Sequence, residues 1–227
     1  MLSPPPSLLE LVSKNLQADA QWKTWLNELY RAVEENMSKD PTLQISKGAI
    51  AGTTQVNKFG RNTAVGTTEE DIWDGGGTYT WPTSASITHL RSAVDSAATR
   101  GKTVEIQGLD TNWELTTQTA TTDGTNSTTE VALTTALRRV FRMKNTSDTD
   151  FDQNVQVGPT GFATIGAQIT NGFNQTLMAL YTIPAGYTGY LTNVWTNMNR
   201  TGGASAALDV VLWARNEVNE WLKRQRV

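Results

Sequence analysis

The sequence predicts a mainly β protein, an antiparallel, jelly-roll-like β-sandwich preceded by a short α-helical N-terminal segment. Hydrophobic residues make up 38% and charged residues 18% of the 227 residues. Thr, Ser, Asn and Gly fill the difference, and these residues suit short strands and turns better than helical bundles. Residues 1–41 differ from the rest because their apolar residues recur at helical spacing. We therefore expect a helical segment at 1–41 and a β-sandwich domain at 42–227.

The N-terminal segment contains signals for two helices. Residues 7–10 (SLLE) match the capping box, which predicts a short helix through Leu16. A second helix is predicted from Asp19 to residues 39–41 (KDP), because the residue before a proline avoids the helical conformation. The apolar residues of the two helices are expected to form a partner or oligomer interface; they are Leu8, Leu11, Trp22, Trp25, Leu26, Leu29, Tyr30 and Val33.

A single amphipathic helix cannot bury such a face by itself. It either packs on its own β-domain or packs on copies of itself or on a partner protein. The proline run at residues 4–6 and the abrupt change of composition after residue 41 favour the second interpretation, a separate anchoring or oligomerisation element.

From about residue 43 onward, short β-branched and aromatic runs alternate with turn signals, as in a sandwich or jelly roll. Strands are predicted at 103–107, 113–117, 140–144, 176–183 and 190–195, with a final hairpin of 207–214 and 217–227 around residues 215–216. Residues 93–101 and 123–129 are expected to be loops. Since 221–227 has strand character without a closing turn, we expect either the last strand of a sheet or a chain shorter than the natural product.

The charge pattern and composition exclude several functions. The net charge is −3 and the basic residues are scattered, which argues against nucleic acid as a partner. The chain has no cysteine, so it forms neither disulfides nor thiolate metal sites. It has no apolar run of the roughly 18 residues that a membrane helix needs, and its start lacks the features of a signal peptide. We expect a soluble protein that is not exported.

No group of residues predicts catalysis. His89 is the only histidine, and no nucleophile-elbow sequence accompanies it; a half-exposed position on a strand is expected. Residues 69–74 (EEDIWD) set carboxylates beside a tryptophan, as in sugar-cleaving sites, but adjacent strand residues point to opposite faces. We predict no enzymatic activity, no catalytic residue and no cofactor.

Two other motifs have structural interpretations. Residues 148–152 (DTDFD) are similar to the opening of a calcium loop, but Gln153 stands where that loop needs glycine; a weak surface Ca²⁺ site there is left open. Residues 75–77 (GGG) are expected to form a turn, since no phosphate-binding Lys-Ser/Thr pair follows them. The tryptophans of the β-region are expected mainly in the core and interfaces, with a sugar-stacking platform as the alternative.

Five segments of the chain carry a resemblance to a known family. They are 56–62 (VNKFGRN), 70–79 (EDIWDGGGTY), 104–110 (VEIQGLD), 139–143 (RVFRM) and 174–186 (NQTLMALYTIPAG). Together they resemble a family of virion structural proteins of marine and freshwater tailed phages, over most of the chain from about residue 45. The resemblance implies a β-sandwich found on head-decoration or fibre-like components, usually trimeric, and carries over no catalytic residue. The sequence departs from the family by ending before the strands that would complete the sandwich.

These observations together predict a non-enzymatic structural protein located in the virion. It is expected to be a homotrimer that docks on capsid, portal, neck or tail proteins through its N-terminal helix. The alternative is a receptor-binding fibre module whose exposed Trp residues and Thr/Asn loops hold a host-surface glycan. A third hypothesis, a depolymerase working through Asp71 or Asp74, is disfavoured by the divergence of adjacent strand side chains.

Overall fold

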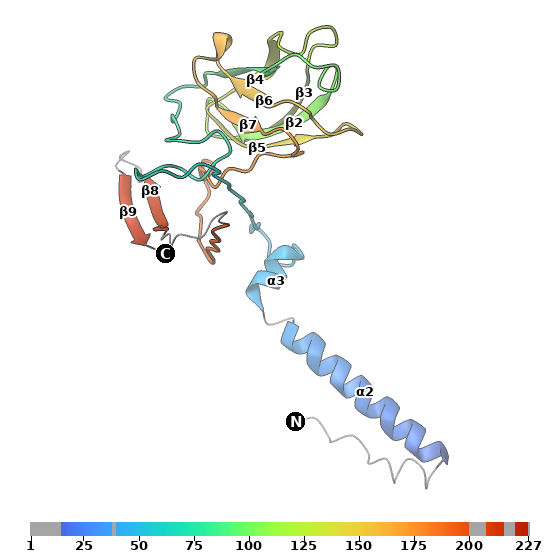
Figure 1. The fold of residues 1–227 in the computed structure, drawn as a ribbon. Helices are drawn as coiled ribbons and strands as arrows, with labels where there is room; N and C mark the ends of the chain where they lie inside the picture. The colour runs from blue at the N-terminus through green and yellow to red at the C-terminus, as the bar shows by residue number, and fades with distance from the viewer. Residues whose placement is uncertain (1–14, 38–39, 200–207, 216–220, 227) are drawn as a thin grey trace. The chain divides into compact units, whose positions relative to one another are not determined.

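The computed structural model describes residues 15–37, 40–199, 208–215 and 221–226 (Figure 1). The chain separates into two units, Met1–Phe59 and Gly60–Val227. The capping box predicted at residues 7–10 lies outside the described residues. Among the described residues, no helix combines the length and the apolar character that crossing a membrane requires.

The first unit contains α2 (Asn15–Met37) and α3 (Pro41–Ser46). The helix α2 runs without a break through Leu16 and Asp19, where the sequence predicted the end of one helix and the start of another. The short helix α3 was not predicted. Asp40 Oδ1 accepts hydrogen bonds from the backbone N–H groups of Thr42, at 2.8 Å, and Leu43, at 3.4 Å, and a proline occupies the first turn. The Asp-Pro pair that was expected to end a helix therefore also starts one.

The second unit is an antiparallel β-sandwich (Figure 1), which confirms the predicted mainly β fold. Its first sheet has the strand order β4-β1-β6-β7 and its second the order β3-β2-β5. The strands are β1 (Ile87–Ser92), β2 (Thr103–Leu109), β3 (Leu115–Thr121), β4 (Val131–Leu137), β5 (Arg139–Asn145), β6 (Val155–Gly158) and β7 (Ala167–Ile169). A third sheet, of two strands, pairs β8 (Val211–Arg215) with β9 (Trp221–Arg226), which confirms the predicted C-terminal hairpin.

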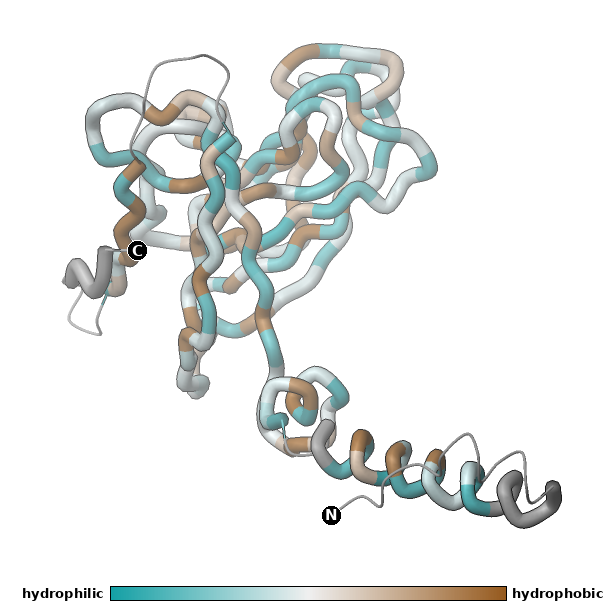
Figure 2. The backbone as a smooth tube through the Cα atoms, turned by 60° about the horizontal axis from the view of Figure 1, so that its bottom comes forward, coloured by the Kyte–Doolittle hydropathy of each residue, from teal (hydrophilic) through white to brown (hydrophobic). Residues whose placement is uncertain are grey.

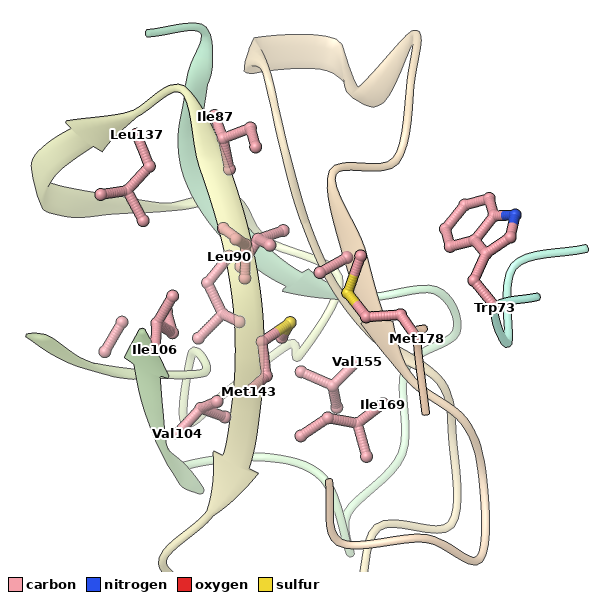
Figure 3. Packing of buried hydrophobic residues seen from close by; sticks show 14 of the residues in the cluster. Trp73, Ile87, Leu90, Val104, Ile106, Leu137, Met143, Val155, Ile169 and Met178 are labelled. Carbon is pink, nitrogen blue, oxygen red and sulfur yellow. The ribbon is translucent and has the colours of Figure 1, made fainter. Parts of the chain in front are cut away.

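The core lies between the two larger sheets. Leu90 of β1 and Ile169 of β7 meet Ile106 of β2 and Met143 of β5, and all four side chains are fully buried (Figure 3). The alternation predicted for 140–144 is confirmed from residue 141 onward, since 141, 143 and 145 of β5 are buried while 142 and 144 are exposed; Val140 is buried as well. Burial of apolar side chains of this size contributes about 1.5–3 kcal/mol each.

At each side of the sandwich, the edge strands of the two sheets are connected without forming a regular strand pair. On one side, the Gln118 side chain of β3 bonds the backbone of Thr135 in β4, accepting from its N–H at 2.9 Å and donating to its C=O at 2.8 Å. On the other side, residues 174–176 extend along β5, with Thr176 N–H donating to the Met143 carbonyl at 3.0 Å. The Gln118 side-chain amide thus takes the place of backbone hydrogen bonds between β3 and β4, and it protects the edges of these two strands from pairing with another chain.

Two predicted strands are wrong. Residues 176–183 form no continuous strand, because they change partner: Thr176 bonds Met143 of β5 through its N–H, and Met178 bridges to Trp73 in the loop before β1. Residues 190–195 belong to no strand, since no described strand pairs with them. A strand pattern needs a neighbour that completes its ladder of hydrogen bonds.

Candidate functional site

The interface residues predicted on the N-terminal segment form one stripe on α2, where Figure 2 shows hydrophobic positions recurring between hydrophilic ones. Leu26, Tyr30 and Val33 are 52%, 66% and 47% exposed. Trp22, Trp25 and Leu29 are half-buried, and the two indole rings meet edge to face with centroids 5.5 Å apart. Leu8 and Leu11 lie outside the described residues. The role of this stripe as an interface stays a prediction.

The first unit has no core of its own among its described side chains. Every side chain described between residues 21 and 59 is exposed or half-buried. Within α2 the contacts are local, such as the Trp22–Trp25 ring pair and the hydrogen bond with Glu34 that raises the pKa of Tyr30. Because most helical stability in proteins comes from packing of an amphipathic face, α2 needs a surface that covers its apolar stripe.

A second exposed apolar region follows the sandwich. We call residues 187–199 the arm. Tyr190 is 86% exposed, Leu191 64% and Trp195 90%, and no charged residue occurs between positions 176 and 199. The arm contains residues 190–195, where the sequence predicted a strand and the structure has none.

Three tryptophans of the second unit, Trp73, Trp81 and Trp113, pack within it. Trp73, Tyr79 and Trp81 form a row of edge-to-face contacts with centroids 5.1 Å apart at each step. The guanidinium group of Arg139 lies 5.1 Å from the ring centroids of both Trp81 and Trp113, and burial lowers the pKa of Arg139. These rings pack with one another and with arginine, an arrangement that stabilises this side of the sandwich.

The carboxylates of residues 69–74 do not converge. Glu70 accepts from the Asn62 side-chain amide at 2.8 Å, and Asp71 accepts from the Tyr79 backbone N–H at 2.7 Å. Burial raises the pKa of Asp74, a shift that Thr170 and Arg61 partly oppose. The carboxylates thus have different partners, and those of Glu70 and Asp71 lie within the loop before β1.

His89 lies on β1 at a half-buried position, as predicted. Its Nδ1 atom is 2.9 Å from the hydroxyl of Thr88 and 3.3 Å from that of Thr160. These hydroxyl contacts place the ring in a polar surface network between β1 and the turn after β6.

The loops at residues 93–101, 123–129 and 146–154 are joined by a carboxylate network that the sequence did not indicate. Asp95 forms an ion pair with Arg100 and accepts from the backbone N–H of Ser127 at 2.8 Å. Asp152 accepts from the hydroxyl of Thr99 at 2.7 Å. Asp152 is thus used in a loop contact, and the described residues contain no group of three or more acidic or histidine side chains that could hold a metal ion.

Because this network depends on ionised carboxylates, we predict that acidic pH lowers the stability of the sandwich through it. The bond from Arg100, assisted by Ser127, holds the pKa of Asp95 well below its usual range, and Ser96 and Thr99 lower that of Asp152. A carboxyl whose pKa is lower in the folded protein than in the unfolded chain, where it is about 3.9, stabilises the fold at pH values above 3.9. This stabilisation is lost as the pH falls from about 3.9 toward the folded-state pKa. In thermal unfolding between about pH 6 and pH 3, Asp95→Asn should flatten the fall in Tm, whereas Asp148→Asn, an exposed carboxylate nearby, should not.

Comparisons of the chain with protein-family models, with curated proteins and with solved structures return no match. The interpretation of function therefore depends on the two apolar surfaces, the stripe on α2 and the arm.

Proposed function

We propose that this chain is a non-enzymatic structural component of a tailed-phage virion that assembles with copies of itself through α2. The observation that carries the proposal is the combination of an exposed apolar stripe with a first unit that has no buried side chain among its described residues. A helix in that situation becomes stable only by packing against another protein surface. The resemblance of the segments between residues 56 and 186 to virion proteins of tailed phages supports the location in a particle.

The spacing along α2 supports a bundle of helices. Trp22, Leu26, Leu29 and Val33 are separated by four, three and four residues, which is the spacing of the a and d positions in a coiled coil. The 23 residues of α2 span about 35 Å at 1.5 Å per residue. This length suffices for a short coiled coil, and the resemblance favours three strands.

The β-sandwich supports a passive role for the second unit. Its loops are connected by Asp95, Asp152 and their partners, and the outer face of β3 carries Thr117, Thr119 and Thr121. Such a neutral, hydroxyl-rich surface suits a stable domain that projects from the particle into solvent. We infer that α2 supplies assembly and that the sandwich is the part presented on the particle.

The test compares a variant of the full chain with a matched control. We call the a and d positions Trp22, Leu26, Leu29 and Val33 the seam. In the seam variant, Leu26→Lys combined with Leu29→Lys places two charges in the seam, and we expect about a 100-fold or greater loss of self-association affinity. Gln21→Lys combined with Asn27→Lys adds the same charge at exposed positions away from the seam and should change nothing. Mass by light scattering should fall to 24.8 kDa only in the seam variant.

Incorporation into particles tests the location. Mass spectrometry of purified virions of the encoding phage should detect the wild-type chain and the control, and the seam variant should be depleted. A wild-type chain that is monomeric and absent from purified virions would contradict the proposal.

A further inference from the structure

An open groove of about 570 Å³ lies beside β5 in the second unit. Its volume is within the range of roughly 300–1,000 Å³ that is usual for small-molecule sites. The groove is formed by β5 and by the segment 172–177, which follows β7. The lining residues that bear on its chemistry are Arg142, Lys144, Phe173, Asn174, Gln175 and Leu177.

The segment 172–177 is fixed against β5. The backbone N–H of Thr176 donates to the Met143 carbonyl at 3.0 Å, and the Arg142 guanidinium donates to Gln175 Oε1 at 3.0 Å. Because these bonds hold the two sides of the groove together before a ligand arrives, binding costs less ordering of side chains and backbone.

The groove carries positive charge in a chain whose net charge is −3. The described side chains that line it include two cations, Arg142 and Lys144, and no carboxylate. Both are exposed, and neither forms an ion pair with another described residue. As alternate residues of one strand they project to the same face, with Cα atoms about 7 Å apart. One carboxylate can therefore contact both the guanidinium fork and the ammonium group.

Two carboxylates beside the groove limit how the charge of a ligand can be distributed. Glu105 of β2 is the register partner of Lys144, and it accepts from the Gln107 side-chain amide at 3.0 Å. Asp150 accepts from the Asn174 side-chain amide. These carboxylates repel the successive charges of a nucleic acid or another polyanion. A single negative charge within an otherwise neutral ligand avoids this repulsion.

The other lining side chains suit neutral sugar units. Phe173 and Leu177 are half-buried and contribute apolar surface, and Arg61 lies over the Phe173 ring, 4.5 Å from its centroid. The Nε2 group of Gln175 has no hydrogen-bond partner among the described residues. A sugar combines an apolar ring face with hydroxyl groups, so it needs both kinds of contact.

We propose that this groove binds a glycan in which one acidic sugar is joined to neutral sugars. The carboxylate of the acidic sugar lies between Arg142 and Lys144, and a neighbouring neutral sugar packs against Phe173 and Leu177 and bonds Gln175 through a hydroxyl. The site differs from the tryptophan platform considered from the sequence, since the described residues that line it include no tryptophan. The inference goes beyond the proposed function and does not depend on α2.

Isothermal titration calorimetry of the full chain tests the groove with two pairs of ligands. The first pair is 3′-sialyllactose, which has one carboxylate beside two neutral sugars, and lactose, which lacks the acidic sugar. The second pair is cellobiouronic acid and cellobiose. We expect each acidic ligand to bind at least about 10-fold more tightly than its neutral counterpart, because hydrogen bonds to charged groups are the stronger ones. Hexaglutamate and a six-nucleotide single-stranded DNA should bind more weakly than the acidic sugars.

A groove variant and a matched control locate the binding. Arg142→Gln combined with Lys144→Gln should weaken binding of the acidic sugars at least about 10-fold. Lys47→Gln combined with Lys102→Gln removes the same charge at lysines outside the groove and should leave the affinity unchanged. Lys144→Gln alone removes no ion pair or side-chain hydrogen bond within the described structure, so it keeps the fold and should still weaken binding about threefold or more.

Three results would overturn the inference: no binding of either acidic sugar, equal affinity for the acidic and neutral members of both pairs, or equal affinity of the groove variants and the control. Tighter binding of hexaglutamate or DNA would overturn it in favour of a polyanion site. A chain that assembles through α2 without binding an acidic sugar contradicts only this inference. A monomeric chain that is absent from virions and still binds the acidic sugars contradicts only the proposed function.

Discussion

Gly108→Ala should lower the free energy of unfolding of the sandwich by about 3 kcal/mol, near the upper end of typical overpacking effects. Gly108 lies on β2 where the pairing with β5 shifts register, next to Val140. A Cβ atom at this position would lie 2.1 Å from the carbonyl oxygen of Arg139. Because the obstacle is a backbone atom in a central strand, it cannot move aside as the end of a side chain can.

Urea unfolding of the full chain measures this effect, with Gly124→Ala as the matched control. Gly124 lies in the loop after β3 and has open space around the position that a Cβ would take. An alanine there should change the unfolding free energy by no more than about 1 kcal/mol, and in the stabilising direction. A Gly108→Ala variant as stable as the control would mean that β2 and β5 do not approach each other in this way.

The strands that the sequence predicted well are those with a clear period of two and a nearby turn. β2 and β5 were both predicted within two residues of their ends, because their alternation is strong and Gly108-Leu109-Asp110 follows the predicted part of β2. β3 begins two residues later than predicted, since Trp113 adopts a positive φ of 65° in the turn and cannot be part of the ladder.

Short buried strands and partner changes could not be predicted in the same way. β6 and β7 have four and three residues, too few to show a period. Residues 176–183 have strand composition, but Thr176 bonds β5 whereas Met178 bridges to Trp73. Such a change of partner depends on tertiary packing, which overrides local propensity in β structure.

The candidate site was predictable where it depends on one helix and not where it depends on distant residues. The stripe from Trp22 to Val33 follows from helical spacing alone. The network of Asp95 brings together residues 32 positions apart, and that of Asp152 spans 53 positions. No local pattern marks such a contact, so only the fold reveals that these carboxylates join loops.

Tyr79→Phe should change how the stability of the sandwich depends on alkaline pH. The Tyr79 ring is 3% exposed, its hydroxyl donates to the Gly166 carbonyl at 2.8 Å, and burial, partly offset by Arg139, raises the pKa of Tyr79 to about 12 from 10.0. The folded protein therefore keeps the phenol proton that the unfolded chain loses between about pH 10 and pH 12. The stability that Tyr79 contributes is complete below pH 10 and decreases by about 3 kcal/mol as the pH rises through this range.

At neutral pH the variant should be less stable than the wild type by about 1–3 kcal/mol, because the Gly166 carbonyl loses its donor inside the core. Above pH 10 the wild type should lose stability faster, so the two curves converge and cross near pH 12 when unfolding is measured by urea titration at each pH. Tyr187→Phe, at a tyrosine that is 65% exposed, should reproduce the wild-type curve. Parallel curves for wild type and Tyr79→Phe would mean that the phenol is not buried between the loop before β1 and the segment before β7, and that this loop is not part of the core.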